Sequence, residues 1–181
     1  MSDDQLIEIE IGDEIIYEGR VVNLHVKQVR LPNGQPAKRE IILHSGAVAV
    51  VPLLPDGQVM LVRQYRKAAD RVLLEVPAGT LDHKGEAPEA AAIRELREEI
   101  GYRANQLTSL GGIFVAPGYS TEYIHLYLAQ DLVHDPLAAD SDEFIHTVTM
   151  PLTEALAKIM SGEIEDAKTV SSLLIAARRF S

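Results

Sequence analysis

A predicted helix in the middle of the chain carries three glutamates on one side. The helix is expected to begin at Pro88, since proline is well tolerated at the first helical position, and to stop at Gly101, a common helix-ending residue. With about 3.6 residues per turn, Glu95, Glu98 and Glu99 fall within roughly 100° of one another. Like charges at this spacing oppose helix formation by roughly 0.2–0.5 kcal/mol per pair. The sequence must therefore contain a reason for placing them together.

The same helix has an apolar stripe that must pack against another part of the fold. Ile93, Leu96 and Ile100 recur at helical spacing and predict a buried face. The rest of the chain supplies mostly strands, because its apolar runs are short, rich in Val, Ile and Tyr, and separated by turn residues. Strands are expected over 14–31, 39–44, 46–54, 58–66, 72–79, 123–128 and 143–150, and two further helices over 152–160 and 169–180.

This order of elements predicts an α/β fold. Strands before the central helix, further strands after it and two helices at the end favour an α/β/α sandwich, in which helices cover both faces of a mixed sheet. The first strands precede this compact pattern. We therefore expect residues 1–45 to form a small N-terminal antiparallel β module and residues 46–181 to form the main domain.

Composition excludes several classes of function. The formal net charge of −10 argues against a non-specific nucleic-acid binder, which needs a basic surface for phosphate contacts. No segment approaches the roughly 18 uninterrupted apolar residues of a membrane span. The chain has no cysteine, so disulfides, thiolate metal sites and cysteine nucleophiles are absent. The acidic N-terminus does not read as a signal peptide, and a cytoplasmic protein is expected.

The acidic helix belongs to a longer motif. Residues 79–102 read GTLDHKGEAPEAAAIRELREEIGY and resemble the Nudix box of the Nudix hydrolases, whose helix carries Arg-Glu-aliphatic-x-Glu-Glu-x-Gly. From Glu86 to Gly101 the match in identity and spacing is complete. Six fixed residue types coincide by chance with a frequency on the order of 10⁻⁷ per window. One departure is that six residues, not five, separate Gly79 from Glu86. Loops tolerate such insertions better than helices or strands.

The resemblance gives the acidic stripe a purpose, where an isolated charged run would more often be a solvated helix face. Mg²⁺, or Mn²⁺ in its place, prefers hard oxygen ligands, and carboxylates on one helix face can hold such ions against a diphosphate. Glu98 is expected to take part in catalysis, while Glu86 and Arg94 orient the ligands through charge-assisted hydrogen bonds. The metal ligands that the resemblance implies are Ala78, through its backbone carbonyl, Glu95, Glu98 and Glu99.

Three stretches outside the box resemble the ADP-ribose pyrophosphatase branch of the family. They are residues 62–79, residues 116–132 and, less closely, residues 142–170. Pro117 stands 15 residues beyond the end of the box at Tyr102, a spacing typical of this branch. Glu75 is notable on its own, because a carboxylate inside an apolar run is costly unless it is paired or binds something. The substrate-binding residues that the resemblance implies are Arg66, Glu75, Pro117 and Gly118.

The resemblance implies an Mg²⁺-dependent homodimer that cleaves ADP-ribose to AMP and ribose 5-phosphate. A late acidic loop offers Asp140, Asp142 and Glu143 as the base that activates water, and Glu143 fits best by residue type and position. The N-terminal strands would contribute to the partner's site. Two other functions stay open: hydrolysis of another nucleoside diphosphate sugar such as GDP-mannose, and a non-catalytic nucleotide sensor. The intact glutamates of the box favour an enzyme.

Overall fold

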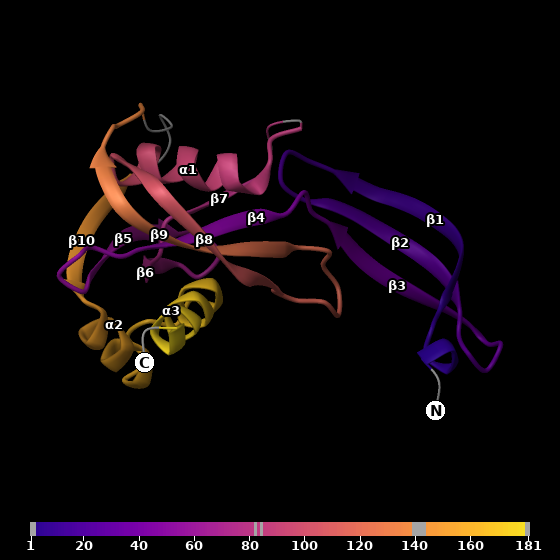
Figure 1. Cartoon of the computed structure of the whole chain (residues 1–181). Coiled ribbons are helices and arrows are strands. Elements are labelled where there is room, and N and C mark those ends of the chain that lie inside the picture. Colours follow the sequence, from indigo (N-terminus) through magenta and orange to yellow (C-terminus); the bar gives the residue numbers. More distant parts are fainter. Residues whose placement is uncertain (1–2, 82, 84, 139–143, 180–181) are drawn as a thin grey trace. The chain divides into compact units, whose positions relative to one another are not determined.

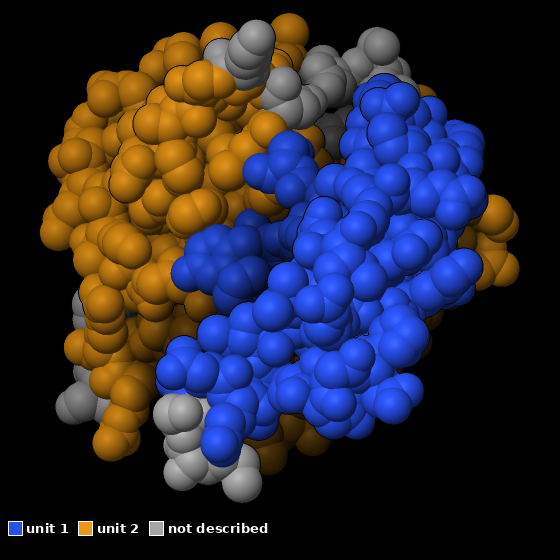
Figure 2. Space-filling model, turned by 90° about the vertical axis from the view of Figure 1, so that its right-hand side faces the viewer, with its two compact units in different colours: residues 1–45, 114–123 blue, residues 46–113, 124–181 orange. Residues whose placement is uncertain are grey.

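The computed structural model describes residues 3–81, 83, 85–138 and 144–179, and the chain divides into two compact units. The first consists of residues 1–45 with residues 114–123, and the second of residues 46–113 and 124–181 (Figures 1 and 2). Among the described residues, no helix is long and apolar enough to cross a membrane.

The first unit is built on an antiparallel sheet in the order β1-β2-β3. After a short 3-10 helix at Asp3–Gln5, the strands are β1 (Ile9–Glu18), β2 (Asn23–Arg30) and β3 (Pro36–Leu43). The strand-rich stretch 14–31 thus belongs to two strands, because the chain turns back where the amide of Gly19 donates to the carbonyl of Val22 at 2.9 Å. Between β2 and β3 the chain turns at residues 31–34, where the amide of Gly34 donates to the carbonyl of Leu31 at 2.8 Å.

The second unit contains two sheets, one mixed and one antiparallel. One has the order β7-β4-β9-β8, with β7 (Ala78–Thr80), β4 (Ala47–Pro52), β9 (Tyr123–His134) and β8 (Tyr102–Phe114). Strand β4 runs parallel to β9 and antiparallel to β7. The other sheet has the order β10-β5-β6, with β10 (Ile145–Pro151), β5 (Gln58–Arg66) and β6 (Arg71–Glu75) paired antiparallel.

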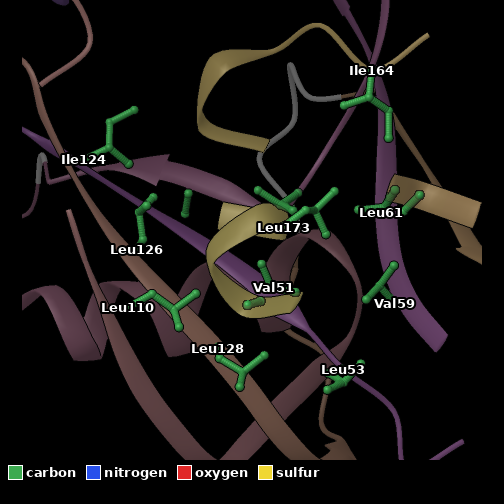
Figure 3. Close-up of a cluster of buried hydrophobic side chains, with 14 of the residues drawn as sticks. Val51, Leu53, Val59, Leu61, Leu110, Ile124, Leu126, Leu128, Ile164 and Leu173 are labelled. Atoms are coloured by element: carbon green, nitrogen blue, oxygen red, sulfur yellow. The ribbon is translucent and has the colours of Figure 1, made fainter. Parts of the chain in front are cut away.

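Helices cover both faces of β4, as the sequence predicted. All six residues of this strand are buried, which is typical of a strand between two layers. Val48 and Val50 pack in a cluster with Leu96 of α1 (Pro88–Glu99). Val51 packs in the opposite cluster, shown in Figure 3, with Leu173 of α3 (Ala167–Arg179). Helix α2 (Leu152–Met160) adds Ala155 to that second cluster. The predicted α/β/α sandwich with a mixed sheet is therefore confirmed.

Strand β8 is the main element that the sequence did not predict. Its 13 residues include two glycines and only two buried side chains, Ala104 and Leu110, so it has no clear alternation of apolar and polar residues. The central helix begins at Pro88 as predicted, and Gly101 follows its end with a φ of +77°, a left-handed conformation that glycine adopts without strain.

Candidate active site

Arg94 of helix α1 gathers three of the predicted glutamates around its guanidinium group. Arg94 donates from Nε and Nη2 to the two carboxylate oxygens of Glu86, both at 3.1 Å. Its Nη1 donates to Glu95 Oε1 at 2.7 Å and to Glu98 Oε2 at 2.9 Å. The hydrogen bonds to Glu86, together with the charges of Glu95 and Glu98, raise the pKa of Arg94 far above its ordinary value. A single arginine thus offsets the repulsion between three carboxylates.

The glutamates of α1 point toward strand β7. Glu95 and Glu99 are buried, each only 8% exposed, although both are acidic. The carboxylate of Glu95 lies directly against the backbone of Gly79, in space that any Cβ at that position would fill. The backbone amide of Ala78 donates to Glu99 Oε2 at 3.3 Å. Strand β7 and helix α1 therefore bring Ala78, Gly79 and the two buried carboxylates together.

The extra residue of the box is taken up in the turn between β7 and α1. Gly85 has a φ of +83°, and the amide of Glu86 donates to the carbonyl of His83 at 3.0 Å. Beyond this turn Glu86 still meets Arg94 through two hydrogen bonds, and Gly79 still meets Glu95. The insertion leaves both ends of the motif in contact with the helix.

The oxygen atoms of this cluster suit a hard divalent cation. Carboxylates and a backbone carbonyl are the ligands that Mg²⁺ and Mn²⁺ prefer, and the close approach of Glu95 to Gly79 leaves room for carboxylate oxygens beside the main chain. Within the described part of the chain, no three acidic or histidine side chains stand close enough together to hold an ion as they are.

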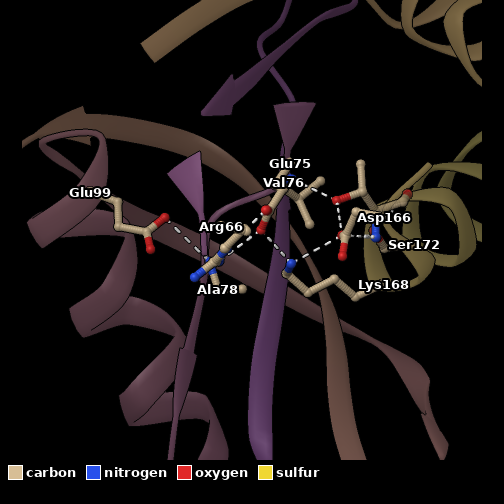
Figure 4. A network of polar contacts seen from close by, with 9 residues as sticks. Arg66, Glu75, Val76, Ala78, Glu99, Asp166, Lys168 and Ser172 are labelled. Atoms are coloured by element: carbon tan, nitrogen blue, oxygen red, sulfur yellow. Dashed lines mark hydrogen bonds and ion pairs between the residues drawn. The ribbon is translucent and has the colours of Figure 1, made fainter. Parts of the chain in front are cut away.

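Arg66 and Glu75, both predicted to bind substrate, form a pair with each other. The guanidinium of Arg66 donates to the two oxygens of Glu75 from Nε at 2.9 Å and from Nη2 at 2.8 Å. Figure 4 shows Arg66 bonded to Glu75 and overlapping Ala78 in this view, with Glu99 bonded to the amide of Ala78. The hydrogen bond to Glu75 raises the pKa of Arg66, and the negative charge of Glu99 adds to this effect. Arg66 therefore lies at the edge of the α1 cluster.

Helix α3 contributes three polar residues that the sequence did not single out. The ammonium group of Lys168 donates to Glu75 Oε2 at 2.5 Å and to Asp166 Oδ2 at 3.0 Å (Figure 4). Asp166 caps the helix by accepting hydrogen bonds from the amide and hydroxyl of Thr169. The Thr169 hydroxyl oxygen in turn accepts the amide of Val76 at 2.9 Å. The local sequence signal was Asp166 immediately before a helix, a common capping pattern.

Arg66 and Lys168 offset the energetic cost of burying the Glu75 carboxylate. Its side chain is 1% exposed, and burial alone would raise the pKa of its carboxyl. The hydrogen bonds from Arg66 and the charge of Lys168 outweigh burial, so the pKa of Glu75 lies below its ordinary value. The carboxylate is thus charged at neutral pH in the folded protein.

Pro117 and Gly118 belong to the first unit, in a turn where the amide of Tyr119 donates to the carbonyl of Ala116 at 3.0 Å. Glu143, with Asp140 and Asp142, lies outside the described residues.

Comparisons with known proteins agree with the motif. The sequence model of the NUDIX domain matches residues 43–173. An ADP-ribose pyrophosphatase of Bacillus subtilis is 42% identical over 93% of this chain and 91% of its own length. A methanol dehydrogenase activator of Bacillus methanolicus is 46% identical over 88% of this chain and 87% of its own. The crystal structure of an ADP compounds hydrolase superposes with a TM-score of 0.85 at 27% identity, over 97% of this chain and 95% of the other.

Proposed function

The chain belongs to the Nudix family, and from this premise we propose that it hydrolyses the diphosphate of ADP-ribose to AMP and ribose 5-phosphate. Enzymes of this family generally need a divalent metal ion. The observation that carries the proposal is the cluster on α1, in which Arg94 gathers Glu86, Glu95 and Glu98. A sensor without turnover would not need two buried carboxylates beside the Ala78–Gly79 main chain.

The proposed cofactor is Mg²⁺, with Mn²⁺ as a substitute. Its ligands would be the carboxylates of Glu95, Glu98 and Glu99 and the backbone carbonyl of Ala78. When bound, the ion polarises the diphosphate and neutralises the charge that develops during hydrolysis. Arg94 orients Glu95 and Glu98 through its hydrogen bonds, and Glu86 holds Arg94 in place through two hydrogen bonds.

The chain's own residues then bind the substrate and move a proton. Arg66 has a guanidinium that suits a diphosphate oxygen, because arginine presents planar donors to phosphate groups. Glu75 orients that guanidinium, and the family resemblance assigns Pro117 and Gly118 to substrate binding as well. Glu143 accepts a proton from the attacking water, whose oxygen bonds to phosphorus while the bridging P–O bond breaks. One phosphate keeps the bridging oxygen and the other takes the oxygen of water, which gives AMP and ribose 5-phosphate.

We further propose that the protein is a homodimer joined through the β module of residues 1–45. Strand β1 lies at the edge of its sheet, and several of its apolar side chains are exposed in the single chain. A second copy is the simplest cover for them. Light scattering should give twice the mass of the chain, and a monomer at all concentrations would contradict the proposal. The exposed residues are Ile9, Ile11, Ile15, Ile16 and Tyr17.

Product analysis tests the proposed reaction. Purified protein is incubated with ADP-ribose, GDP-mannose or a dinucleoside polyphosphate, with Mg²⁺ or with a chelator. We expect Mg²⁺-dependent release of AMP from ADP-ribose, well ahead of the other substrates. Glu99→Gln should lower kcat by about 100-fold or more, since several kcal/mol of charge stabilisation depend on the ion, whereas Glu154→Gln on α2 should leave it unchanged. Faster turnover of GDP-mannose would show that ADP-ribose is not the preferred substrate. No turnover of any of these compounds would contradict the proposal that the protein is an enzyme.

A second candidate function is activation of a methanol dehydrogenase. It is favoured by the 46% identity to an activator of that name. Adding the protein to a methanol dehydrogenase and following its rate tests this function directly. A rise in the dehydrogenase rate that Glu99→Gln abolishes would show that activation depends on hydrolysis. An unchanged dehydrogenase rate would contradict this second function.

A further inference from the structure

Lys168 occupies an unusual position for a lysine. It is the second residue of α3 (Ala167–Arg179), and the amino end of a helix carries a partial positive charge that disfavours cations. Its side chain is nevertheless 12% exposed, and its ammonium group lies within hydrogen-bond distance of both Glu75 and Asp166. Burial of this charge at this end of a helix requires a compensating partner, and the nearly inaccessible Glu75 is that partner.

Lys168 and Arg66 bind the same carboxylate, and both donate to its Oε2 atom. Arg66 uses Nε and Nη2 for Glu75, so Nη1 takes no part in that pair. The charges that act on Arg66 come from β6, α1 and the residue that caps α3, namely Glu75, Glu99 and Asp166. The orientation of the guanidinium beside Ala78 therefore depends on where the Glu75 carboxylate is held, and Lys168 is one of the two groups that hold it (Figure 4).

We propose that Lys168 is a positioning residue for the hydrolysis of nucleoside diphosphate compounds, which fixes Arg66 toward the diphosphate through Glu75. This inference rests on the proposed function, because it assigns Arg66 to the substrate. The physical reason is geometric: a carboxylate held only by Arg66 can turn together with it, whereas a carboxylate tied to α3 gives the guanidinium one orientation. Misplacement of a binding group by about 1 Å can cost 10²-fold in rate.

The test compares three variants of the full-length protein. Lys168→Met removes the ammonium group and keeps the apolar stem, while Lys168→Arg restores a positive charge. Lys158→Met is the matched control, because Lys158 of α2 also bridges two carboxylates, Glu163 at 2.9 Å and Glu154 at 3.8 Å, away from Arg66. Steady-state kinetics with ADP-ribose and Mg²⁺ separate KM from kcat, and equilibrium dialysis with chelator gives the Kd of ADP-ribose without turnover.

We expect Lys168→Met to raise KM and Kd by about tenfold, the size of one charge-assisted hydrogen bond. Lys168→Arg should recover much of this loss, and Lys158→Met should match the wild type. A purely structural role would lower the melting temperature or the yield of folded enzyme but would not change KM or Kd per folded molecule. Unchanged KM and Kd in Lys168→Met, with the wild type active, would overturn the role of Lys168 alone. A wild type that neither binds nor hydrolyses any nucleoside diphosphate compound would overturn the proposed function, and this inference with it.

Discussion

Replacing Gly79 with alanine should remove most of the activity without weakening the fold. A Cβ at this position would lie 2.5 Å from Glu95 Oε2 and nearer still to Cδ and Oε1, whereas ordinary contacts begin at 3.4 Å. The carboxylate would therefore have to retreat by more than 1 Å, and a displacement of about 1 Å can already cost 10²-fold when the group positions a reaction. We expect kcat/KM to fall about 100-fold, or about 2.7 kcal/mol in transition-state free energy.

Stability should not follow activity in this variant. The group that must move is the end of a flexible side chain, and Gly79 does not have a left-handed φ. Alanine should thus fit the strand backbone, where it is favoured over glycine by roughly 0.5–1 kcal/mol. The melting temperature is expected to match or slightly exceed that of the wild type.

Gly57→Ala provides the matched control with the opposite pattern. Gly57 has a φ of +81° and no atom within 4 Å of an added Cβ, so alanine is strained there but meets no neighbour. This variant should lose about 1–2 kcal/mol of unfolding free energy and keep its kcat/KM. The assay is AMP release from ADP-ribose with Mg²⁺, paired with thermal unfolding. A Gly79→Ala enzyme with the wild-type kcat/KM would refute the placement of the Glu95 carboxylate.

Three further changes probe other parts of the chain. Glu143→Gln should lower kcat by about 10²–10⁴-fold, the usual range for a lost general base. Asp140→Asn and Asp142→Asn should have little effect on kcat. Equal losses in all three variants would contradict the choice of Glu143 as the base. Burial, with the nearby charge of Glu89, raises the pKa of Tyr127 from 10.0 to about 12, so the unfolded state loses its proton first and stability should fall as pH rises from 10 to 12. Urea unfolding at pH 10 and pH 12 should show that Tyr127→Phe loses about 1–3 kcal/mol less unfolding free energy over this range than the wild type. The same pH dependence in both proteins would contradict the raised pKa of Tyr127. Thr169→Val leaves the amide of Val76 without its acceptor and should cost about 1–3 kcal/mol, whereas the exposed Thr149→Val should be nearly neutral; equal values would contradict the role of the Thr169 hydroxyl.

The parts of the site that the sequence predicted share one property, which is that their geometry is local. Helical spacing alone places Glu95, Glu98 and Glu99 on one stripe, and the same helix brings Arg94 to Glu98 through an i,i+4 contact. Glu75 was suspect because it lies inside an apolar run, and it is indeed buried with partners. Each inference needed only residues within one element or one turn of it.

What the sequence did not predict depends on contacts between distant segments. Strand β8 follows from backbone pairing in the sheet, because its side chains show no alternation that could reveal it. The division of residues 14–31 into two strands depends on a turn at Gly19 that carries no strong turn signal. In both cases the backbone hydrogen bonds decide the structure, and side-chain patterns report them poorly.

Lys168 shows the same limit within the site itself. It lies 93 positions from Glu75 in the chain, and nothing in the residues around it distinguishes it from the solvated lysines of other helices. The partial positive charge at the amino end of a helix even disfavours a lysine at this position. That local conflict is informative only once the fold places a buried carboxylate beside it, because the energy gained from Glu75 then explains why the lysine is tolerated. Further contributors to this site should therefore be sought among residues that contact a buried charge although local helix or strand preferences disfavour them.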